Sequence, residues 1–330
     1  MDNKKILITG ATGSFGKKMV ERIIKKYNVK RLVIFSRDEL KQSLLREKYP
    51  ENKYRNLRFF IGDIRDQERV ISAFNDIDIV IHAAALKQVT TAEYNPIECI
   101  KTNIIGAENV IKAAFACNVK KVVALSTDKA VDPVNLYGAT KLASEKLFIS
   151  ANNIFGNKPT RFSVVRYGNV IGSRGSVVEV FNKILKIKKE PFTITEKNMT
   201  RFWMTIDESV DLVLKSLNLM NGGETFIPKI PSIKILDLAR SFDPKRKLKI
   251  IGIRPGEKIN ETLCSAATAH LTLEFKDHFV IIPSHVGNIK KSSYIKNKLG
   301  QKGKFVSSNF TYSSENNNFL SIKEIKQRLN

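Results

Sequence analysis

A tyrosine and a lysine four residues apart, Tyr137 and Lys141, follow an apolar segment that ends in Thr127, Asp128 and Lys129. Residues four apart share one face of a helix, so the ammonium group can lie beside the phenol. An adjacent cation in a dry site can stabilise a tyrosinate by about 4 kcal/mol, enough to bring the pKa of the phenol towards neutrality. Asp128 and Lys129 add an acid and an amine. We therefore expect these five residues to form a catalytic site that moves several protons.

A glycine-rich turn lies near the start of the chain, after an apolar segment and before a helical pattern. This is the context of a dinucleotide-binding turn. Glycines permit a tight turn and close approach of the backbone to a pyrophosphate, while the N-terminus of the helix faces the phosphates. The residues of the turn that we expect to contact the cofactor are Gly10, Thr12, Gly13, Ser14, Phe15 and Gly16.

The choice between NAD and NADP depends on the residues after the second strand. NAD enzymes commonly have a carboxylate there for the ribose 2′-hydroxyl, whereas an arginine accommodates the 2′-phosphate of NADP. Ser36, Arg37 and Lys41 can form a phosphate cradle, which favours NADP over NAD. In the alternative, this segment is a solvated charged turn and Asp38 binds the ribose. The other expected cofactor contacts are Asp63, Ile64, Ala83, Ala84, Lys87, Leu125, Ser126, Tyr137 and Lys141.

Short apolar segments alternate with helical patterns through the first half of the chain. Strands are expected at residues 5–9, 31–35, 57–61, 77–83, 120–125 and 162–166, with helical patterns such as 16–26 and 107–116 between them. This alternation predicts an α/β protein with a Rossmann-like, doubly wound parallel sheet. We expect an NADP-binding domain at 1–170, to which a helix at 207–220 returns, and a smaller substrate-binding region at 171–330. The polar stretch 292–318 is either a capping segment or partly disordered.

The composition limits the other classes of function. The chain has 330 residues, 42% of them hydrophobic, and no apolar run near the roughly 18 to 20 residues that span a bilayer. We expect a cytoplasmic protein with no signal peptide and no membrane partner. Its three cysteines and four histidines show no metal-ligand spacing, so no metal is expected. The net charge of +24 is spread along the chain without a nucleic-acid-binding motif; it indicates attraction of anionic substrates rather than nucleic acid.

Longer motifs extend over nearly the whole chain. They are SRDELKQ (36–42), AEYNPIECIKTNI (92–104), ALSTDKA (124–130), LYGATKLASEKLF (136–148), RYGNVIGSRGSVV (166–178), MTRFW (199–203), IRPGEK (253–258) and YSSENN (312–317). With the glycine turn, they resemble the inverting UDP-N-acetylglucosamine 4,6-dehydratases of the extended short-chain dehydrogenase/reductase family, in the soluble group that begins pseudaminic acid synthesis. The combination of TDK with YGATK is the most specific of these motifs.

The resemblance implies a reaction and a set of roles. Asp128, Lys129 and Tyr137 would carry the dehydration, and Lys141 would position the nicotinamide ribose. The implied product is UDP-2-acetamido-2,6-dideoxy-β-L-arabino-hex-4-ulose, made with a tightly bound NADP that is not consumed. The resemblance also implies a homo-oligomer, with a hexamer as the expected form.

The expected proton states follow from the chemistry of the reaction. Tyr137 takes the proton of the C4 hydroxyl, a neutral Lys129 removes the C5 hydrogen, and a protonated Asp128 assists loss of the C6 hydroxyl. The alternative for Asp128 and Lys129 is a simple ion pair that caps a strand. Arginine matches phosphate geometry, so we expect Arg201 and Arg254 to hold the diphosphate. The full set of expected substrate contacts is Lys87, Asn169, Val170, Val177, Thr195, Arg201, Arg254 and Glu257.

Rival functions on the same fold stay open. An epimerase needs neither a C5 base nor a C6 acid, and retaining 4,6-dehydratases usually carry Asp-Glu where this chain carries Asp128-Lys129. A cofactor-sensing binding protein typically lacks the tyrosine or lysine of the pair, and both are present here. The positions that depart from the motifs of the resembled family leave open which UDP-sugar is used; they are Gln88, Thr90, Glu179, Asn198 and Asn260.

Overall fold

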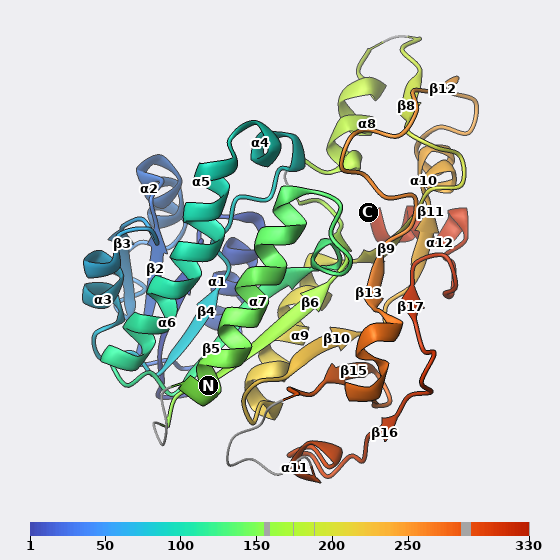
Figure 1. Cartoon of the computed structure of the whole chain (residues 1–330). Helices are drawn as coiled ribbons and strands as arrows, with labels where there is room; N and C mark the ends of the chain where they lie inside the picture. The colour runs from blue at the N-terminus through green and yellow to red at the C-terminus, as the bar shows by residue number, and fades with distance from the viewer. Residues whose placement is uncertain (155–158, 174, 188, 285–291, 330) are drawn as a thin grey trace.

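The computed structural model describes residues 1–154, 159–173, 175–187, 189–284 and 292–329, arranged as a large α/β part with a smaller part beside it (Figure 1). Six strands of the large part are parallel and adjacent in the order β3-β2-β1-β4-β5-β6. They are β1 (Lys5–Thr9), β2 (Arg31–Ser36), β3 (Leu57–Ile61), β4 (Ile79–His82), β5 (Lys121–Thr127) and β6 (Arg161–Tyr167). This order is that of a doubly wound dinucleotide-binding sheet. The predicted fold class is confirmed, and the predicted strand ends differ from the observed ones by at most two residues.

Segments from the second half of the chain extend this sheet. Next to β6 lies β10 (Thr225–Pro228), which is parallel to it, and then β15 (His278–Ile281), β14 (Thr272–Glu274) and β16 (Lys304–Phe305), which pair antiparallel. From the sequence, only one helix was expected to return to the large part, and it is observed as α9 (Ile206–Leu219). The added strands are short, and β10 and β16 pair with segments distant in the sequence, so local patterns give little signal of them.

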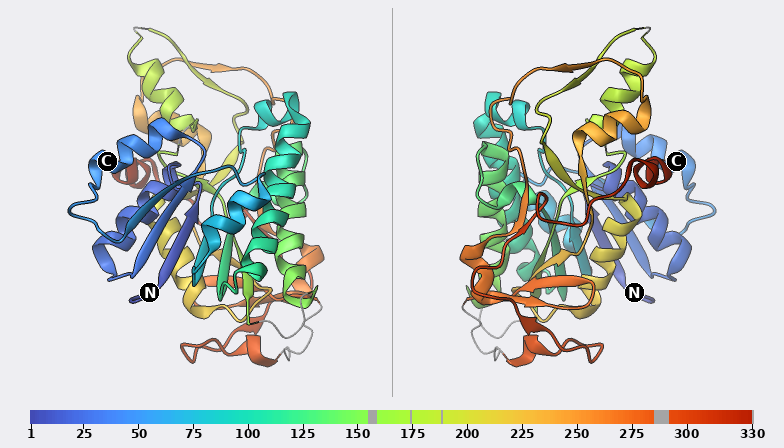
Figure 2. Two further views of the ribbon diagram at one scale, coloured as in Figure 1. Left: turned by 90° about the vertical axis from the view of Figure 1, so that its left-hand side faces the viewer. Right: turned by 90° about the vertical axis from the view of Figure 1, so that its right-hand side faces the viewer.

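Helices cover both faces of the sheet (Figure 2). On one face α1 (Ser14–Lys26) packs against α9; on the other α3 (Gln67–Phe74), α6 (Gly106–Ala116) and α7 (Leu136–Ile154) pack in a row. Ile6 and Ile8 of β1 belong to the core on the first face and Leu7 to the core on the second. Because alternate residues of a strand point to opposite faces, a strand covered on both sides is apolar throughout.

The large part has three further helices, one after β2 and two before α6. They are α2 (Glu39–Lys48), α4 (Val89–Tyr94) and α5 (Pro96–Ile100), and a π-helical turn at Lys101–Ile105 joins α5 to α6. In the described part of the chain, no helix combines the length and the apolar character needed to cross a bilayer.

The smaller part has its own core, in which Phe181, Phe192 and Trp203 are buried. Its elements are β7 (Asn169–Val170), α8 (Val177–Leu185), β8 (Phe192–Ile194), β9 (Thr200–Met204), β11 (Ser232–Lys234), α10 (Ile235–Phe242), β12 (Leu248–Ile250), β13 (Thr262–Cys264), β17 (Tyr312–Ser313) and α12 (Ile322–Leu329). The stretch 292–318 contains α11 (Ser292–Ile295), β16 and β17, and β17 pairs with β13. A capping role for this stretch stays a prediction.

Candidate active site

The predicted catalytic residues meet at the carboxyl end of β5, the edge at which open α/β sheets bind their ligands. Thr127 ends β5, a 3-10 turn at Asp128–Ala130 carries the acid and the amine, and Tyr137 lies in the first turn of α7. A Cβ atom added to Gly138 would lie 2.2 Å from the carbonyl oxygen of Lys129. The glycine therefore lets α7 lie directly against the turn that carries the amine.

Lys129 lies between two buried carboxylates. Its Nζ is 3.0 Å from Asp128 Oδ1 and 3.0 Å from Glu261 Oε1. Asp128 is 0% exposed and Glu261 is 2% exposed. Thr127 Oγ1 donates to Asp128 Oδ1 at 2.9 Å, and Arg201 Nε lies 3.9 Å from Glu261 Oε1. The contacts from Asp128 to Lys129, from Lys129 to Glu261 and from Glu261 to Arg201 thus join side chains of alternating charge.

This arrangement decides the charge of the amine. Burial lowers the pKa of Lys129, but the negative charges of Asp128 and Glu261 outweigh it and hold the pKa well above its usual range. The resting site thus contains an ammonium group, and the expectation that Lys129 is neutral is wrong for this state. The reason is the second carboxylate, Glu261, which the sequence did not single out.

The pKa of Tyr137 also differs from the sequence-based prediction. Burial raises the pKa of Tyr137 to about 12, and the charge of Lys129 with a hydrogen bond to Thr127 opposes this only in part. The prediction that a cation lowers this pKa is therefore wrong for the resting site, because loss of hydration outweighs the cation. Lys141 donates from Nζ to the carbonyl oxygen of Leu125 at 2.6 Å, and burial lowers the pKa of Lys141 to about 8.

The glycine turn has the close contacts of a dinucleotide site. Gly10 has φ +66°, and a Cβ atom there would lie 2.8 Å from the backbone nitrogen of Ala84 at the end of β4. At Gly16 a Cβ atom would lie 2.5 Å from Ala11 Cα, so α1 packs directly on the turn. Ser126 Oγ is buried and has no hydrogen-bond partner among the described residues. A backbone cradle at a helix N-terminus and this orphaned hydroxyl fit a bound dinucleotide.

The residues after β2 are tied together by ion pairs. The carboxylate of Asp38 caps α2, accepting from the backbone nitrogen of Lys41 at 2.9 Å, and it also pairs with the Lys41 ammonium. Arg37 Nη1 lies 3.6 Å from Asp63 Oδ2. Ser36 is buried, and its hydroxyl accepts from Gln42 Nε2 at 3.1 Å. Ser36 thus ends β2, Arg37 follows it and Lys41 lies in the first turn of α2, with the Asp38 carboxylate engaged at the N-terminus of that helix.

Asp63 and Ile64, expected to contact the cofactor, follow β3. Burial raises the pKa of Asp63, but hydrogen bonds from Arg65 outweigh it and leave the pKa below its usual value. Ile64 is 4% exposed and lies under Gly106, where a Cβ atom would approach Ile64 Cδ1 to 2.7 Å. Of the other cofactor residues, Thr12 is buried, Ala83 and Ala84 are half-buried and Lys87 is exposed.

The predicted substrate residues surround the catalytic turn unevenly. Asn169 and Val170 form β7, and Asn169 Oδ1 is buried with no hydrogen-bond partner in the described part of the chain. Val177 begins α8, and Thr195 is buried beyond β8. Arg254 is exposed, and its Nη1 lies 3.8 Å from Glu257 Oε1.

Arg201 has a structural role that the sequence did not indicate. It is 9% exposed, and its guanidinium donates to the carbonyl oxygens of Thr200, Ile259 and Lys258 at 2.7, 2.9 and 2.9 Å. These bonds hold the segment before Glu261 against β9. A contact between Arg201 and a diphosphate stays a prediction.

The segment that carries Arg254 and Glu257 is fixed over the catalytic turn. Lys258 Nζ donates to the carbonyl oxygen of Val131 at 2.6 Å, and Asn135 Nδ2 donates to that of Gly256 at 2.8 Å. The structure thereby joins the start of α7 to a segment more than a hundred residues further along the chain.

Positions that depart from the motifs lie around this region. Asn260 Oδ1 accepts from Thr200 Oγ1 at 2.7 Å, and its Nδ2 donates to Glu315 Oε2 at 2.7 Å. Glu179 Oε2 accepts from the backbone nitrogen of Gly175 at 2.7 Å, and a Cβ atom at Gly175 would lie 2.3 Å from Gln88 Nε2. Thr90 and Asn198 are exposed.

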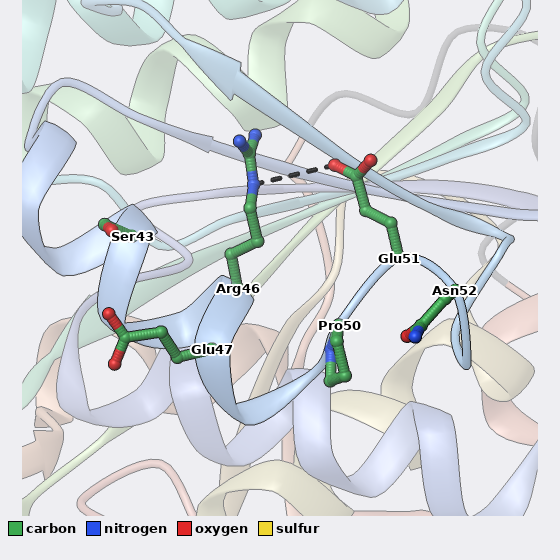
Figure 3. A pocket seen from close by; sticks show the side chains of 6 residues that line it. All are labelled: Ser43, Arg46, Glu47, Pro50, Glu51 and Asn52. Atoms are coloured by element: carbon green, nitrogen blue, oxygen red, sulfur yellow. Dashed lines mark ion pairs between the residues drawn. The ribbon is translucent and has the colours of Figure 1, made fainter.

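A surface hollow of about 360 Å³ lies away from these residues (Figure 3). It is lined by side chains of α2 and the following loop: Ser43, Arg46, Glu47, Pro50, Glu51 and Asn52. Arg46 Nε lies 3.5 Å from Glu51 Oε1 across it. None of its lining residues belongs to the catalytic turn or the glycine turn, so we assign it no part in the chemistry.

Sequence reasoning missed Glu261 and the residue that fixes it, Ser314. The available signals were weak: Glu261 follows Asn260, a departing position, and Ser314 lies inside the YSSENN motif at 312–317. Neither signal predicts contact between the segment that contains Glu261 and the segment that contains Ser314.

Comparisons with known proteins are consistent with this geometry. The family model described as "Polysaccharide biosynthesis protein" matches residues 6–283. A UDP-N-acetylglucosamine 4,6-dehydratase (inverting) of Campylobacter jejuni is 53% identical over 330 residues, which cover 100% of this chain and 98% of that protein. A UDP-glucose 4-epimerase of Rickettsia bellii is 40% identical over 334 residues, covering 99% of this chain and 95% of that protein.

Two solved structures are similar in fold. Pen from Bacillus thuringiensis has a TM-score of 0.88 and 38% identity, covering 99% of this chain and 96% of that one. DesIV, a dTDP-glucose 4,6-dehydratase from Streptomyces venezuelae with NAD and TYD bound, has a TM-score of 0.68 and 18% identity, covering 78% of this chain and 87% of that one. The second likeness concerns the fold alone.

Proposed function

The chain belongs to the polysaccharide biosynthesis protein family, in the extended short-chain dehydrogenase/reductase fold, and on that premise we propose that it is an inverting UDP-N-acetylglucosamine 4,6-dehydratase. The observation that carries the proposal is the lysine held 3.0 Å from a buried aspartate at the end of β5, with a buried tyrosine in the adjoining helix. An acid and an amine in contact are what a 4,6-dehydration needs and what a 4-epimerisation does not. The proposed product is UDP-2-acetamido-2,6-dideoxy-β-L-arabino-hex-4-ulose.

NADP is the proposed cofactor, held by the glycine turn at 10–16, by Ser126 and by the turn after β2. When bound, NADP would supply a hydride acceptor for oxidation at C4 and a hydride donor for C6. Arg37 and Lys41 would contact the 2′-phosphate. Support comes from Asp38, whose carboxylate caps α2 and pairs with Lys41, an arrangement that engages the group an NAD enzyme would use on the ribose.

The acid and the base of the dehydration can arise from one proton transfer. At rest the shared proton is on Lys129 as an ammonium group, beside the Asp128 carboxylate. Movement of that proton across the 3.0 Å contact gives a neutral amine and a carboxylic acid without any net uptake of protons. The reactive forms expected from the sequence therefore need only this exchange and not two independently shifted pKa values.

The chain's own groups then act in order. Tyr137 must first lose its phenolic proton to solvent, because burial keeps it a phenol at rest. As a tyrosinate it then takes the proton of the C4 hydroxyl, and the resulting C4 ketone acidifies the C5 hydrogen. The amine of Lys129 removes the C5 proton while the acid of Asp128 protonates the departing C6 hydroxyl, which leaves as water. Lys129 is then an ammonium group and Asp128 a carboxylate, so the pair regains its resting charges. A proton from solvent then adds to C5 from the opposite face, which inverts that centre.

The test is to incubate the purified protein with UDP-N-acetylglucosamine in deuterated water and follow the sugar by NMR. The proposal predicts a 4-keto-6-deoxy sugar with deuterium at C5 and the L-arabino configuration. A product with the original configuration at C5 would indicate a retaining 4,6-dehydratase. A C4 epimer would instead match the 40% identical epimerase relative. If no UDP-sugar is turned over, even with NADP⁺ added, the result would favour the alternative of a cofactor-sensing binding protein.

We further propose a homo-oligomer, with a hexamer as the expected form, in the cytoplasm. Support for self-association comes from Tyr94 and Ile97 of α4 and α5, which are 88% and 58% exposed. Light scattering during size-exclusion chromatography measures the state directly, and a monomer at micromolar concentration would refute it.

A further inference from the structure

Glu261 has the features of a group built to act on Lys129. Its side chain is 2% exposed, and Oε1 lies 3.0 Å from Lys129 Nζ, on a contact separate from that of Asp128. Its other oxygen, Oε2, is buried and has no hydrogen-bond partner among the described residues. A buried carboxylate with one unpartnered oxygen is costly to keep, which argues for a functional reason.

The backbone of Glu261 is clamped from the C-terminal segment. Its nitrogen donates to Ser314 Oγ at 2.9 Å, and its carbonyl oxygen accepts from the nitrogen of Ser314 at 2.8 Å. Ser314 is 0% exposed, and its hydroxyl also contacts Thr200 Oγ1 at 2.7 Å. With the bonds from Arg201 to the carbonyl oxygens of residues 258 and 259, these contacts fix the carboxylate before any substrate arrives.

Four charged or titratable groups face the Lys129 amine. They are Asp128 from the same turn, Glu261 from the segment before β13, Arg201 from β9 and Tyr137 from α7. The guanidinium of Arg201 also lies near Glu261, with Nε 3.9 Å from Oε1.

We propose that Glu261 is a positioning residue of the dehydration, which aims the Lys129 amine at C5 and stabilises the ammonium group that forms as the C5 proton is taken. Many enzymes orient a catalytic base with a third group. A carboxylate in that position stabilises the cation that forms in the transition state more than it stabilises the neutral base. This inference rests on the proposed function, because it assigns Glu261 to one step of that reaction.

The first test needs no turnover. Acetic anhydride acylates only the neutral form of an amine, and the Lys129 side chain is 23% exposed. Competitive acetylation with peptide mass spectrometry therefore reports the neutral fraction of Lys129 at each pH. Glu261→Gln keeps the shape and removes the charge, so the rate of labelling of Lys129 at pH 8 should rise at least about tenfold. A rate within twofold of the wild type would overturn the proposal.

The second test is kinetic. Glu261→Gln should lower kcat about 10²-fold, the size seen on removing one preorganised electrostatic contact, with KM changed less than about threefold. Glu261→Asp, which keeps the charge, should recover part of the loss. The matched control is Glu224→Gln, another glutamate that is 2% exposed, which bonds Ser163 at 2.7 Å away from the site. It should leave both the labelling of Lys129 and kcat unchanged.

The two tests separate the two proposals. A wild type without dehydratase activity would overturn the proposed function and the role in C5 deprotonation with it. The labelling would still decide whether Glu261 holds Lys129 charged. An active enzyme in which Glu261→Gln changes only KM or stability would limit Glu261 to a structural role.

Discussion

Replacing Lys129 by methionine tests the charge arrangement of the site most directly. Methionine keeps the length of the side chain and removes the ammonium group that lies 3.0 Å from each of two buried carboxylates. Asp128 and Glu261 would then lose the cation between them and repel each other. We expect both loss of the dehydration and a marked loss of stability.

The size of the stability loss can be worked from the burial of the partners. Breaking a buried ion pair by removing one member costs about 3–5 kcal/mol, since an uncompensated charge stays buried. For 330 residues, an unfolding entropy of about 2.1 cal/mol/K per residue gives about 0.7 kcal/mol per degree. The thermal midpoint of Lys129→Met should therefore fall by about 4–7 °C at pH 7.5.

The loss should shrink in acid. In the variant, the two carboxylates can relieve their repulsion by taking up a proton in the folded state before the unfolded chain does so. The folded state then binds more protons than the unfolded state, so its stability relative to the wild type rises as the pH falls from 7.5 to 5.

The assay is thermal unfolding of both proteins at pH 7.5 and pH 5 at one scan rate, with dehydratase turnover measured alongside. The matched control is Lys112→Met, which breaks an exposed pair with Glu108 at 2.7 Å on α6 and should cost under about 1 kcal/mol. A Lys129→Met protein as stable as this control at pH 7.5, or one that retains more than a tenth of wild-type turnover, would refute the reasoning.

Two further predictions concern the tyrosine and the cofactor. Tyr137→Phe keeps the buried ring beside Ala92 and Cys99 and removes the proton acceptor, so kcat should fall about 10³-fold with an unchanged thermal midpoint; turnover within tenfold of the wild type would exclude Tyr137 as the base. Arg37→Ser should weaken binding of NADP about tenfold or more and leave NAD within about twofold, because a charged hydrogen bond contributes about 1.5–3 kcal/mol. Calorimetric titration of both dinucleotides measures this, and equal losses for the two would point to a contact outside the 2′-phosphate.

Much of the fold was accessible to local patterns. Apolar segments separated by helical periodicity predicted the six central strands, because a strand covered on both faces has to be apolar along its length. The edge formed by β10, β15, β14 and β16 was not predicted. Those strands have two to four residues each, too few for a clear alternating pattern, and β10 and β16 pair with segments distant in the sequence.

The catalytic site likewise has one part that the sequence predicted and another that only the structure revealed. Adjacency placed Asp128 beside Lys129, and helical spacing placed Tyr137 beside Lys141. The packing of α7 against the 3-10 turn, through Gly138, brings the two pairs together. Only the tertiary structure brought Glu261 to the amine, with Ser314 behind it. It thereby decided that Lys129 rests as an ammonium group and that the pKa of Tyr137 rises to about 12. Residue types and spacing determine which groups can react, but charge states depend on burial and on charges from distant segments, which are set only when the chain is folded.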